Sequence, residues 1–345
     1  MQLHSRSVVK SKAHCKLSDL LVRIKRGGFV KYKVLITGAS GYIGGALVDR
    51  LASKQAAWQV VGSVRKALEA PLDNVEYFVT GDLAGEVDWS RALQGVDVVV
   101  HTAGRAHKLL AGETEDQFDR INVGATQSLL KAAASAGVKR FIFLSSIGVL
   151  GERHAVPVTE SAAPAPTQAY GRSKLRAEQA VQAFCTEHSI EYVIVRPTLV
   201  YSAAAPGNFR RLLGIVARGW PLPFKGLSGQ RSFVALDNVC QFLELLLQHP
   251  AAANEIYHLC DDKPLTLPAL LTILSEGMGK RCRLFAIPDA IPYVLARVSG
   301  RIRLYNQLYG SFVVSNHKAK QQLGWHMEVD PQQALHRAAE QFIQS

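Results

Sequence analysis

VLITGASGYIG, residues 34–44, is the stretch that decides the fold. An apolar strand runs into three glycines and then into an apolar-periodic helix that begins near Ile43. This geometry seats a dinucleotide pyrophosphate on a helix N-terminus. We expect Gly38 to allow the tight turn, Gly41 to let the backbone approach the phosphates, and Gly44 to let the helix pack on the strand. The spacing is G-x-x-G-x-x-G rather than G-x-G-x-x-G, so the loop alone also fits an ordinary left-handed turn.

Apolar strand patterns alternate with helical patterns from Lys31 onward. The expected strands span residues 33–37, 58–64, 75–79, 96–101, 140–145 and 191–196, and the expected helices span 43–54, 89–94, 116–136 and 169–188. Continuous Val/Ile-rich strands are typical of a parallel sheet covered on both faces. The sequence therefore predicts an α/β fold, a Rossmann-like doubly wound parallel sheet that binds its ligand at the carboxyl ends of the strands.

The pattern loosens after Pro197, which suggests two domains. We expect a dinucleotide-binding domain over residues 31–200, with residues 232–260 returning to it. Residues 201–231 and 261–345 are expected to form a smaller C-terminal α/β substrate lobe, with β-like runs at 281–286 and 311–315. Asp237 is expected to cap a helix that ends near Gln248.

The net charge of +12 is concentrated near the N-terminus. Residues 1–33 hold nine Lys/Arg and one acidic residue, whereas the remaining chain holds 31 Lys/Arg and 27 acidic residues. The body is therefore close to neutral, which argues against a nucleic-acid partner. We interpret residues 1–30 as a disordered basic extension; an anionic surface as its ligand or a targeting role are the alternatives.

Composition also bounds the cellular setting. No window of 18 residues is both apolar and free of charge, so no integral membrane segment is expected. Five widely spaced cysteines without a C-x-x-C pair favour a reduced, cytoplasmic protein and offer no metal site.

Tyr170 and Lys174 lie four residues apart at the start of an expected helix, so both point from one face. An ammonium near a phenol lowers the phenol pKa, and such a phenol can exchange a proton with a carbonyl or alcohol oxygen. Ser145 and Ser146 end the strand that precedes this helix, where a hydroxyl could bond the same oxygen. A surface pair on a helix and a serine pair closing a strand are the structural alternatives. Together with the glycine loop, these residues predict a hydride-transfer site.

With these motifs the chain resembles the extended short-chain dehydrogenase/reductase family, in the branch of nucleotide-sugar epimerases, dehydratases and reductases. The resemblance covers residues 31–345. It rests on TGASGYIG at 37–44, GDL at 81–83, HTAG at 101–104, N-V-x-x-T at 122–126, SS at 145–146, Y-x-x-x-K at 170–174 and RP at 196–197. It implies an NAD(P)-dependent enzyme acting on a UDP-sugar, with Tyr170 as acid/base, Ser146 as the catalytic hydroxyl and Lys174 also holding the nicotinamide ribose.

The resemblance also implies further cofactor contacts. Asp82 and Leu83 would flank the adenine, and Asn122 would brace the active-site helix. The remaining implied cofactor residues are Tyr42, Ile43, Thr102, Ala103, Gly104 and Pro197.

Three residues are implied on the substrate side. Arg231 would meet the diphosphate with its guanidinium, although a surface arginine fits as well. Asn208 would lie near the nucleotide, or it caps a helix. His107 could face the sugar, or it is a partly exposed structural histidine.

The end of the second strand decides the type of cofactor. NAD enzymes usually place Asp or Glu there for the ribose 2′-OH, whereas an arginine accommodates the 2′-phosphate of NADP. Here Ser63, Arg65 and Lys66 stand with no acid before Glu69. We favour NADP(H), with NAD(H) possible, because a solvated basic turn would show the same pattern.

Within the branch, the chain is most similar to bacterial enzymes of surface-polysaccharide (lipopolysaccharide O-antigen) synthesis. These reduce the 4-keto group of UDP-2-acetamido-2,6-dideoxy-hexulose and give UDP-N-acetylquinovosamine. The similarity lies in residues 145–152, 207–209 and 318–325. The alternative is a UDP-hexose or UDP-N-acetylhexosamine 4-epimerase with tightly bound NAD. A dehydratase fits less well, because Ile147-Gly148 stand where dehydratases carry an acidic pair, and a non-catalytic NADP-binding protein is the remaining hypothesis.

The resemblance also implies a homodimer. The family pairs through the helices expected here over residues 116–136 and 169–188. Their apolar positions would allow a four-helix interface, although packing inside one chain explains them equally well: Leu129, Ala133, Ala177, Val181 and Phe184.

Overall fold

The structure is a computed structural model, and it describes part of the chain with both backbone and side chains. The described residues are 31–106, 115–151, 156–288, 290–300, 305 and 309–344, with the backbone alone at 24–25 and 28–29. Those two pairs form the short strands β1 (Ile24–Lys25) and β2 (Gly28–Phe29). The rest of the predicted extension over residues 1–30, and His107, lie outside the described residues.

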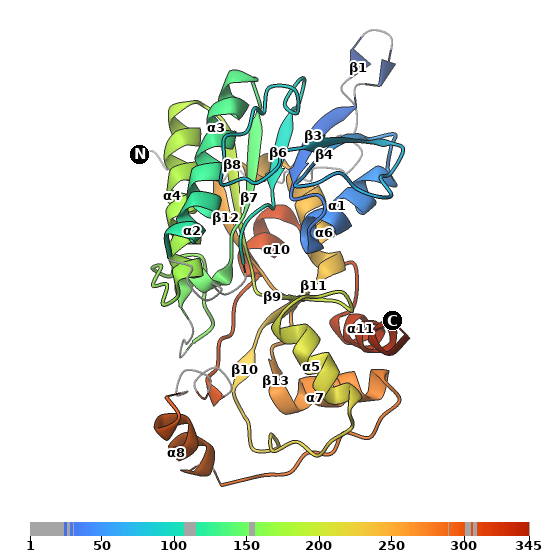
Figure 1. Cartoon of the computed structure of the whole chain (residues 1–345), viewed down its shortest axis with the longest axis vertical. Coiled ribbons are helices and arrows are strands. Elements are labelled where there is room, and N and C mark those ends of the chain that lie inside the picture. Colours follow the sequence, from blue (N-terminus) through green and yellow to red (C-terminus); the bar gives the residue numbers. More distant parts are fainter. Residues whose placement is uncertain are drawn as a thin grey trace, which may run out of the picture.

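Seven parallel strands form the central sheet, in the order β12-β8-β7-β6-β3-β4-β5 (Figure 1). Their bounds are β3 Tyr32–Thr37, β4 Trp58–Val64, β5 Val75–Val79, β6 Val98–His101, β7 Arg140–Leu144, β8 Glu191–Pro197 and β12 Glu255–Leu259. The order reverses between β3 and β6, as in a doubly wound fold. The predicted fold class is therefore confirmed.

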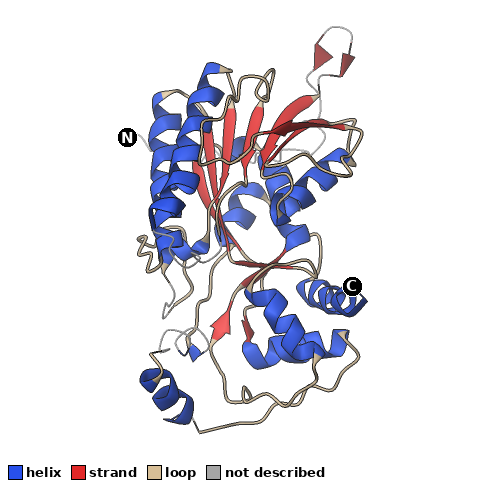
Figure 2. Cartoon of the chain, viewed as in Figure 1, coloured by secondary structure: helices blue, strands red, loops and turns tan. Residues whose placement is uncertain are grey.

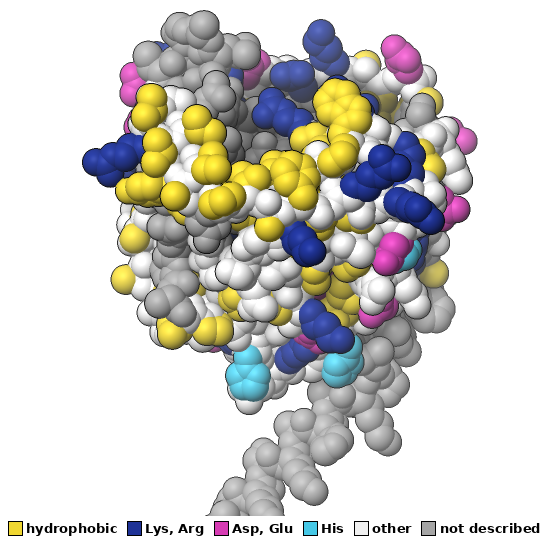
Figure 3. Space-filling model, turned by 90° about the horizontal axis from the view of Figure 1, so that it is seen from below, with side chains coloured by type: hydrophobic (Ala, Val, Ile, Leu, Met, Phe, Trp, Pro, Cys, Tyr) yellow, Lys and Arg dark blue, Asp and Glu magenta, His cyan; other side chains and the backbone are white. Residues whose placement is uncertain are grey.

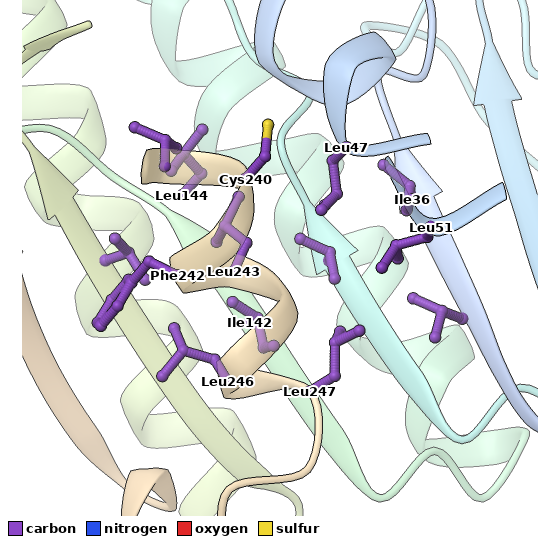
Figure 4. Packing of buried hydrophobic residues seen from close by; sticks show 14 of the residues in the cluster. Ile36, Leu47, Leu51, Ile142, Leu144, Cys240, Phe242, Leu243, Leu246 and Leu247 are labelled. Carbon is purple, nitrogen blue, oxygen red and sulfur yellow. The ribbon is translucent and has the colours of Figure 1, made fainter. Parts of the chain in front are cut away.

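Helices cover both faces of this sheet. Alternate residues of a strand point to opposite faces, and the buried clusters divide accordingly. Val34 and Ile36 pack with α1 (Tyr42–Ala52) and α6 (Leu236–Leu246), while Leu35 packs with α3 (Ala125–Ser135) and α4 (Ala169–Glu187). Figure 4 shows Leu47 and Leu51 of α1 facing α6 over the first of these faces. Burial on both faces explains why the strands read as continuous Val/Ile runs.

A smaller lobe lies below the carboxyl edge of the sheet (Figure 2). Two strand pairs begin it: β9 (Leu199–Tyr201) runs parallel to β11 (Phe233–Ala235), and β10 (Gln230–Arg231) runs antiparallel to β13 (Leu265–Thr266). Three helices build its core, α5 Asn208–Ala217, α7 Leu267–Gly277 and α11 Pro331–Gln344. Another helix, α8 (Ala290–Val298), stands apart at its lower end (Figure 1). The small lobe therefore lies next to the carboxyl ends of the sheet strands.

One segment inside the expected lobe lies elsewhere. α10 (His317–Leu323) and Trp325 pack in the cluster over the central sheet. The division into domains otherwise stays a prediction.

Several local predictions were wrong. Residues 89–94 form turns rather than a helix. The helix expected over 116–136 is split into α2 (Glu115–Asp119), a π-helical turn η2 (Arg120–Gly124) and α3. The run 281–286 makes one isolated bridge, from Leu284 to Leu222, and no strand. Ala235, not Asp237, is the N-cap of α6. Each error concerns a local feature whose form depends on tertiary neighbours as well as on the sequence.

The residues expected at a dimer interface are mostly internal. Leu129, Ala133, Ala177 and Val181 are completely buried against the central sheet of their own chain. Packing inside one chain therefore accounts for them, and the homodimer stays a prediction. Among the described residues, no helix is both long and apolar enough to cross a membrane.

Candidate active site

The candidate site lies where the strand order reverses, because loops from both halves of a doubly wound sheet meet there. β3 and β6 are neighbours whose last residues, Thr37 and His101, are directly paired. Gly38 follows β3 and Thr102 follows β6, so the two motifs leave the sheet side by side. The candidate cofactor residues of both motifs thus come together.

The glycine loop has no room for side chains at two positions. Gly38 adopts φ +69°, the left-handed region that glycine favours. A Cβ at residue 44 would lie 2.2 Å from the Gly38 carbonyl oxygen and 2.6 Å from Thr102 Oγ1. Gly41 is the N-cap of α1 and offers no side-chain capping bond. The backbone N–H groups of the first turn of α1 are therefore suited to an anion, which fits the pyrophosphate of a dinucleotide.

A buried polar chain ties β3 to β6 and to the helix behind it. Thr126 Oγ1 donates to the Asn122 carbonyl oxygen (2.8 Å), so it accepts from His101 Nε2 (3.0 Å). His101 Nδ1 then accepts from Thr37 Oγ1 (2.7 Å), which in turn accepts from the Ala103 N–H (3.2 Å). Burial, together with the Lys174 charge, lowers the His101 pKa to about 3, so the ring stays neutral. This network fixes the loop that begins at Thr102.

Asn122 connects that loop to the helix of Tyr170. Its Oδ1 accepts from the Arg105 N–H (2.8 Å), and its Nδ2 donates to the Arg105 carbonyl (3.1 Å) and to Ser173 Oγ (2.9 Å). The π-helical turn η2 places this buried side chain between the two. Ser173 Oγ donates to the Tyr170 carbonyl (2.9 Å), so loop and helix are fastened together.

Ser146 and Tyr170 meet at the end of β7. Tyr170 sits at the start of α4, and Ser146 caps the short helix η3 (Ile147–Leu150) by accepting from the Gly148 N–H (3.1 Å). Burial raises the Tyr170 pKa to about 12, and the hydrogen bond with Ser146 partly opposes this rise. The expectation of a lowered Tyr170 pKa does not hold in this structure, because desolvation outweighs the other contributions. At neutral pH Tyr170 therefore carries the proton that a general acid needs.

Lys174 is buried beside these two residues. Its Nζ donates to the Leu144 carbonyl oxygen (2.8 Å) and lies 4.6 Å from the centre of the Phe143 ring. A Cβ on Gly104 would lie only 3.2 Å from that Nζ, so Gly104 and Lys174 face each other. Burial lowers the Lys174 pKa to about 8, and the nearby Glu178 carboxylate opposes this.

Sequence reasoning missed the buried ion pair behind Lys174. Arg196 of β8 makes two bonds to Glu178 of α4, from Nε (3.0 Å) and Nη2 (2.6 Å). Ser145 Oγ donates to the same carboxylate. Only 1% of the Glu178 side chain and 4% of the Arg196 side chain are exposed. The spacing could have revealed Glu178, since it follows Lys174 by four residues and so shares its helix face.

The residues expected near the adenosine half of the cofactor lie at or just beyond the carboxyl ends of β4 and β5. Ser63 is buried, and its carbonyl accepts from the Ala39 N–H (2.9 Å) of the glycine loop. Arg65 is exposed just beyond β4. Asp82 is exposed and accepts from the Ala84 N–H (3.0 Å), while Leu83 is partly buried against the sheet. No acidic side chain stands at the end of β4.

The expected substrate residues lie in the small lobe. Asn208 is exposed at the start of α5 and is not its cap, because Gly207 holds that place. Arg231 is half-buried in β10, where its backbone pairs with Leu265. Tyr42 links the two parts of the site, since its hydroxyl donates to Ser202 Oγ (2.9 Å) just after β9. Pro197 ends β8 beside β12.

Residues 34–260 match the NAD dependent epimerase/dehydratase family. The chain belongs to this family. The span runs from β3 through β12, so it includes the glycine loop, Ser146, Tyr170 and Lys174. The family resemblance inferred from the sequence is thus confirmed. The chain is an enzyme of the oxidoreductase class, in the family of nucleotide-sugar epimerases, dehydratases and reductases.

This chain is also similar to characterised epimerases. It is 32% identical over 317 residues to the UDP-glucose 4-epimerase of Vibrio cholerae, which covers 90% of this chain and 96% of the relative. It is 28% identical over 274 residues, 77% of each chain, to the N-acetyl-alpha-D-glucosaminyl-diphospho-ditrans,octacis-undecaprenol 4-epimerase of Escherichia coli O157:H7. The crystal structure of the UDP-glucuronic acid 4-epimerase of Bacillus cereus with NAD shares the fold, with a TM-score of 0.73 and 23% identity, over 90% of this chain and 98% of that one.

Proposed function

We propose that this family member is an NADP(H)-dependent reductase of the 4-keto group of a UDP-2-acetamido-2,6-dideoxy-hexulose, forming UDP-N-acetylquinovosamine. The observation that carries the proposal is the basic end of β4. Arg65 and Lys66 are exposed there, beside the glycine loop and without an acidic residue. A guanidinium suits a 2′-phosphate dianion, whereas NAD sites usually carry a carboxylate. A net reductase must exchange its cofactor after each turnover, which NADPH suits.

The chain's own residues would manage the proton in this reaction. The bound nicotinamide supplies the hydride. Tyr170, protonated at neutral pH, donates its proton to the oxygen of the 4-keto group, while Ser146 hydrogen-bonds the same oxygen. Lys174 places a positive charge behind this pair below about pH 8. Arg231, in β10 of the small lobe, would bind the diphosphate of the substrate with its guanidinium.

Oxidation of NADPH tests the proposal directly. The purified chain is mixed with freshly made UDP-2-acetamido-2,6-dideoxy-4-hexulose, and the loss of NADPH absorbance is compared with that of NADH. We expect turnover with NADPH and a preference for it over NADH. Turnover with neither cofactor would contradict the proposal.

A 4-epimerase is the second candidate, and the similarity to the Vibrio cholerae enzyme favours it. The same Ser146, Tyr170 and Lys174 would serve an epimerase, which retains its nicotinamide between turnovers. The discriminating assay offers UDP-glucose and UDP-N-acetylglucosamine without added cofactor. Conversion to the 4-epimers, with tightly bound NAD in the purified protein, would establish the epimerase in place of the reductase.

Replacing Arg65 by alanine should weaken the binding of NADPH but not that of NADH. Loss of a charge-assisted bond to the 2′-phosphate is expected to raise KM for NADPH about 10- to 100-fold. KM for NADH should stay unchanged, because NADH has no phosphate at this position. Arg91→Ala, at another exposed arginine, is the matched control. An equal effect of Arg65→Ala on both cofactors would refute the phosphate role.

Glu178→Gln should shift the pH profile of turnover. The Glu178 carboxylate raises the Lys174 pKa, so its removal lowers that pKa further below its value of about 8. Lys174 is charged below its pKa, and its charge is lost as the pH rises. The alkaline limb of kcat/KM for reduction is therefore expected to move to lower pH. Superimposable profiles of the parent and the variant would contradict this linkage between Glu178 and Lys174.

A further inference from the structure

The helix α8 exposes an unusual amount of apolar surface. None of its residues is buried. Its large exposed apolar side chains are Ile291, Tyr293, Val294, Leu295 and Val298. The exposed fractions reach 63% at Leu295 and 83% at Val298. The helix projects from the end of the small lobe that lies farthest from the sheet (Figure 1). Clustered exposure of this kind marks an interaction surface.

Two loops of the same lobe also expose large apolar side chains. Trp220 is 63% exposed and Phe285 is 45% exposed. Backbone bonds hold their loops together, from the Leu222 N–H to the Arg283 carbonyl (2.8 Å) and from the Phe285 N–H to the Leu222 carbonyl (3.0 Å). Residues 218–228 and 279–300, which include these loops and α8, are called the lobe tip below.

The lobe tip is strongly basic. Its lysines and arginines are Arg218, Lys225, Lys280, Arg281, Arg283 and Arg297, and all of them are exposed. Its sequence contains one acidic residue, Asp289, against these six basic ones. The Arg218 guanidinium lies 5.3 Å from the Trp220 ring centre, so positive and aromatic groups are adjacent. Figure 3, the view onto this end, shows hydrophobic side chains beside Lys and Arg.

We propose that the lobe tip docks the enzyme onto the surface of an anionic lipid bilayer. Apolar side chains interspersed with lysine and arginine insert at the headgroup boundary, and basic side chains are drawn to anionic headgroups. α8 has nine residues, far fewer than a spanning helix needs, so it lies on the bilayer. A second copy of the chain is disfavoured as the occupant, because two basic lobe tips would repel each other. Docking is independent of which sugar nucleotide the site accepts.

Vesicle co-sedimentation tests this proposal with the full chain and no substrate. The vesicles contain phosphatidylethanolamine with or without phosphatidylglycerol. We expect the protein to pellet with the phosphatidylglycerol vesicles only, and less so in high salt. The double variant Leu295→Glu/Val298→Glu should bind about tenfold more weakly, because it replaces two inserted side chains by charges that anionic lipid repels. Both positions are exposed, so folding should be unaffected, which circular dichroism and the thermal midpoint verify.

The control variant replaces two exposed apolar residues by glutamate at positions away from α8. Val156→Glu/Ile343→Glu changes two exposed apolar residues outside the lobe tip and should bind as the parent does. Residues 1–33 are basic as well, and they are unchanged in both variants. Equal binding by the α8 variant and the parent would therefore assign the binding to another part of the chain and overturn the proposal. Absence of parent binding to phosphatidylglycerol vesicles would overturn it too. So would a change of oligomeric state in the α8 variant, because α8 would then be a subunit interface.

Discussion

Tyr170→Phe is expected to lower kcat for reduction about a thousandfold, the scale of a lost general acid. Phenylalanine keeps the ring that lies 6.2 Å from the Phe118 ring, so packing is retained while the transferable proton is lost. Because the hydroxyl acts on the reacting oxygen, KM for NADPH should stay within a small factor of the parent value. Steady-state oxidation of NADPH with the UDP-4-keto sugar measures both constants.

The matched control for this variant is Tyr192→Phe. Tyr192 lies near the start of β8, at the end of the strand remote from the site, and should lose no activity. An active Tyr170→Phe enzyme would show that another group supplies the proton.

Arg196→Met is expected to destabilise the fold by about 3–5 kcal/mol, because it leaves the Glu178 carboxylate buried without its cation. The pair is nearly inaccessible to water and is bidentate, so no solvent replaces the lost partner. Chemical denaturation measures the free energy of unfolding. We expect the loss of stability to be larger than any loss of catalytic activity. The side-chain bonds of Arg196 reach neither Tyr170 nor Ser146.

Two controls isolate the burial of that charge. The double variant Arg196→Met/Glu178→Met removes both charges and should recover most of the lost stability. Arg176→Met removes the exposed partner of Asp119 and should cost about 0–1 kcal/mol. A cost for Arg196→Met as small as that for Arg176→Met would show that the buried pair contributes little.

The central sheet could be predicted because its strands are buried on both faces. β4 and β5 have the predicted bounds, and β7 and β8 differ by one residue. The segment at 116–136 could not be predicted in detail. Asn122 is held by Arg105 and by Ser173 from other elements, and the π-helical turn accompanies these tertiary bonds. A helical period read from sequence carries no information about such bonds.

The proximity of the candidate site residues was predictable from the sequence, but their electrostatics were not. Motif order along the chain indicated that Ser146, Tyr170 and Lys174 belong together. Burial, which the sequence does not display, then raises the Tyr170 pKa rather than lowering it. The Lys174 ammonium donates to a strand carbonyl and has Glu178 behind it, a pairing that depends on how α4 packs on β8.

Transfer of deuterium tests the central claim, reduction at C4, most directly. NADPH that carries deuterium at the transferable position of its nicotinamide is incubated with the protein and the UDP-4-keto sugar. The product is then examined by nuclear magnetic resonance. We predict one deuterium at C4 of a UDP-N-acetyl-6-deoxyhexosamine, with one NADP⁺ formed per product. Unlabelled 4-epimers of a UDP-hexose control, formed without consumption of the added cofactor, together with no product from the keto sugar, would contradict the account.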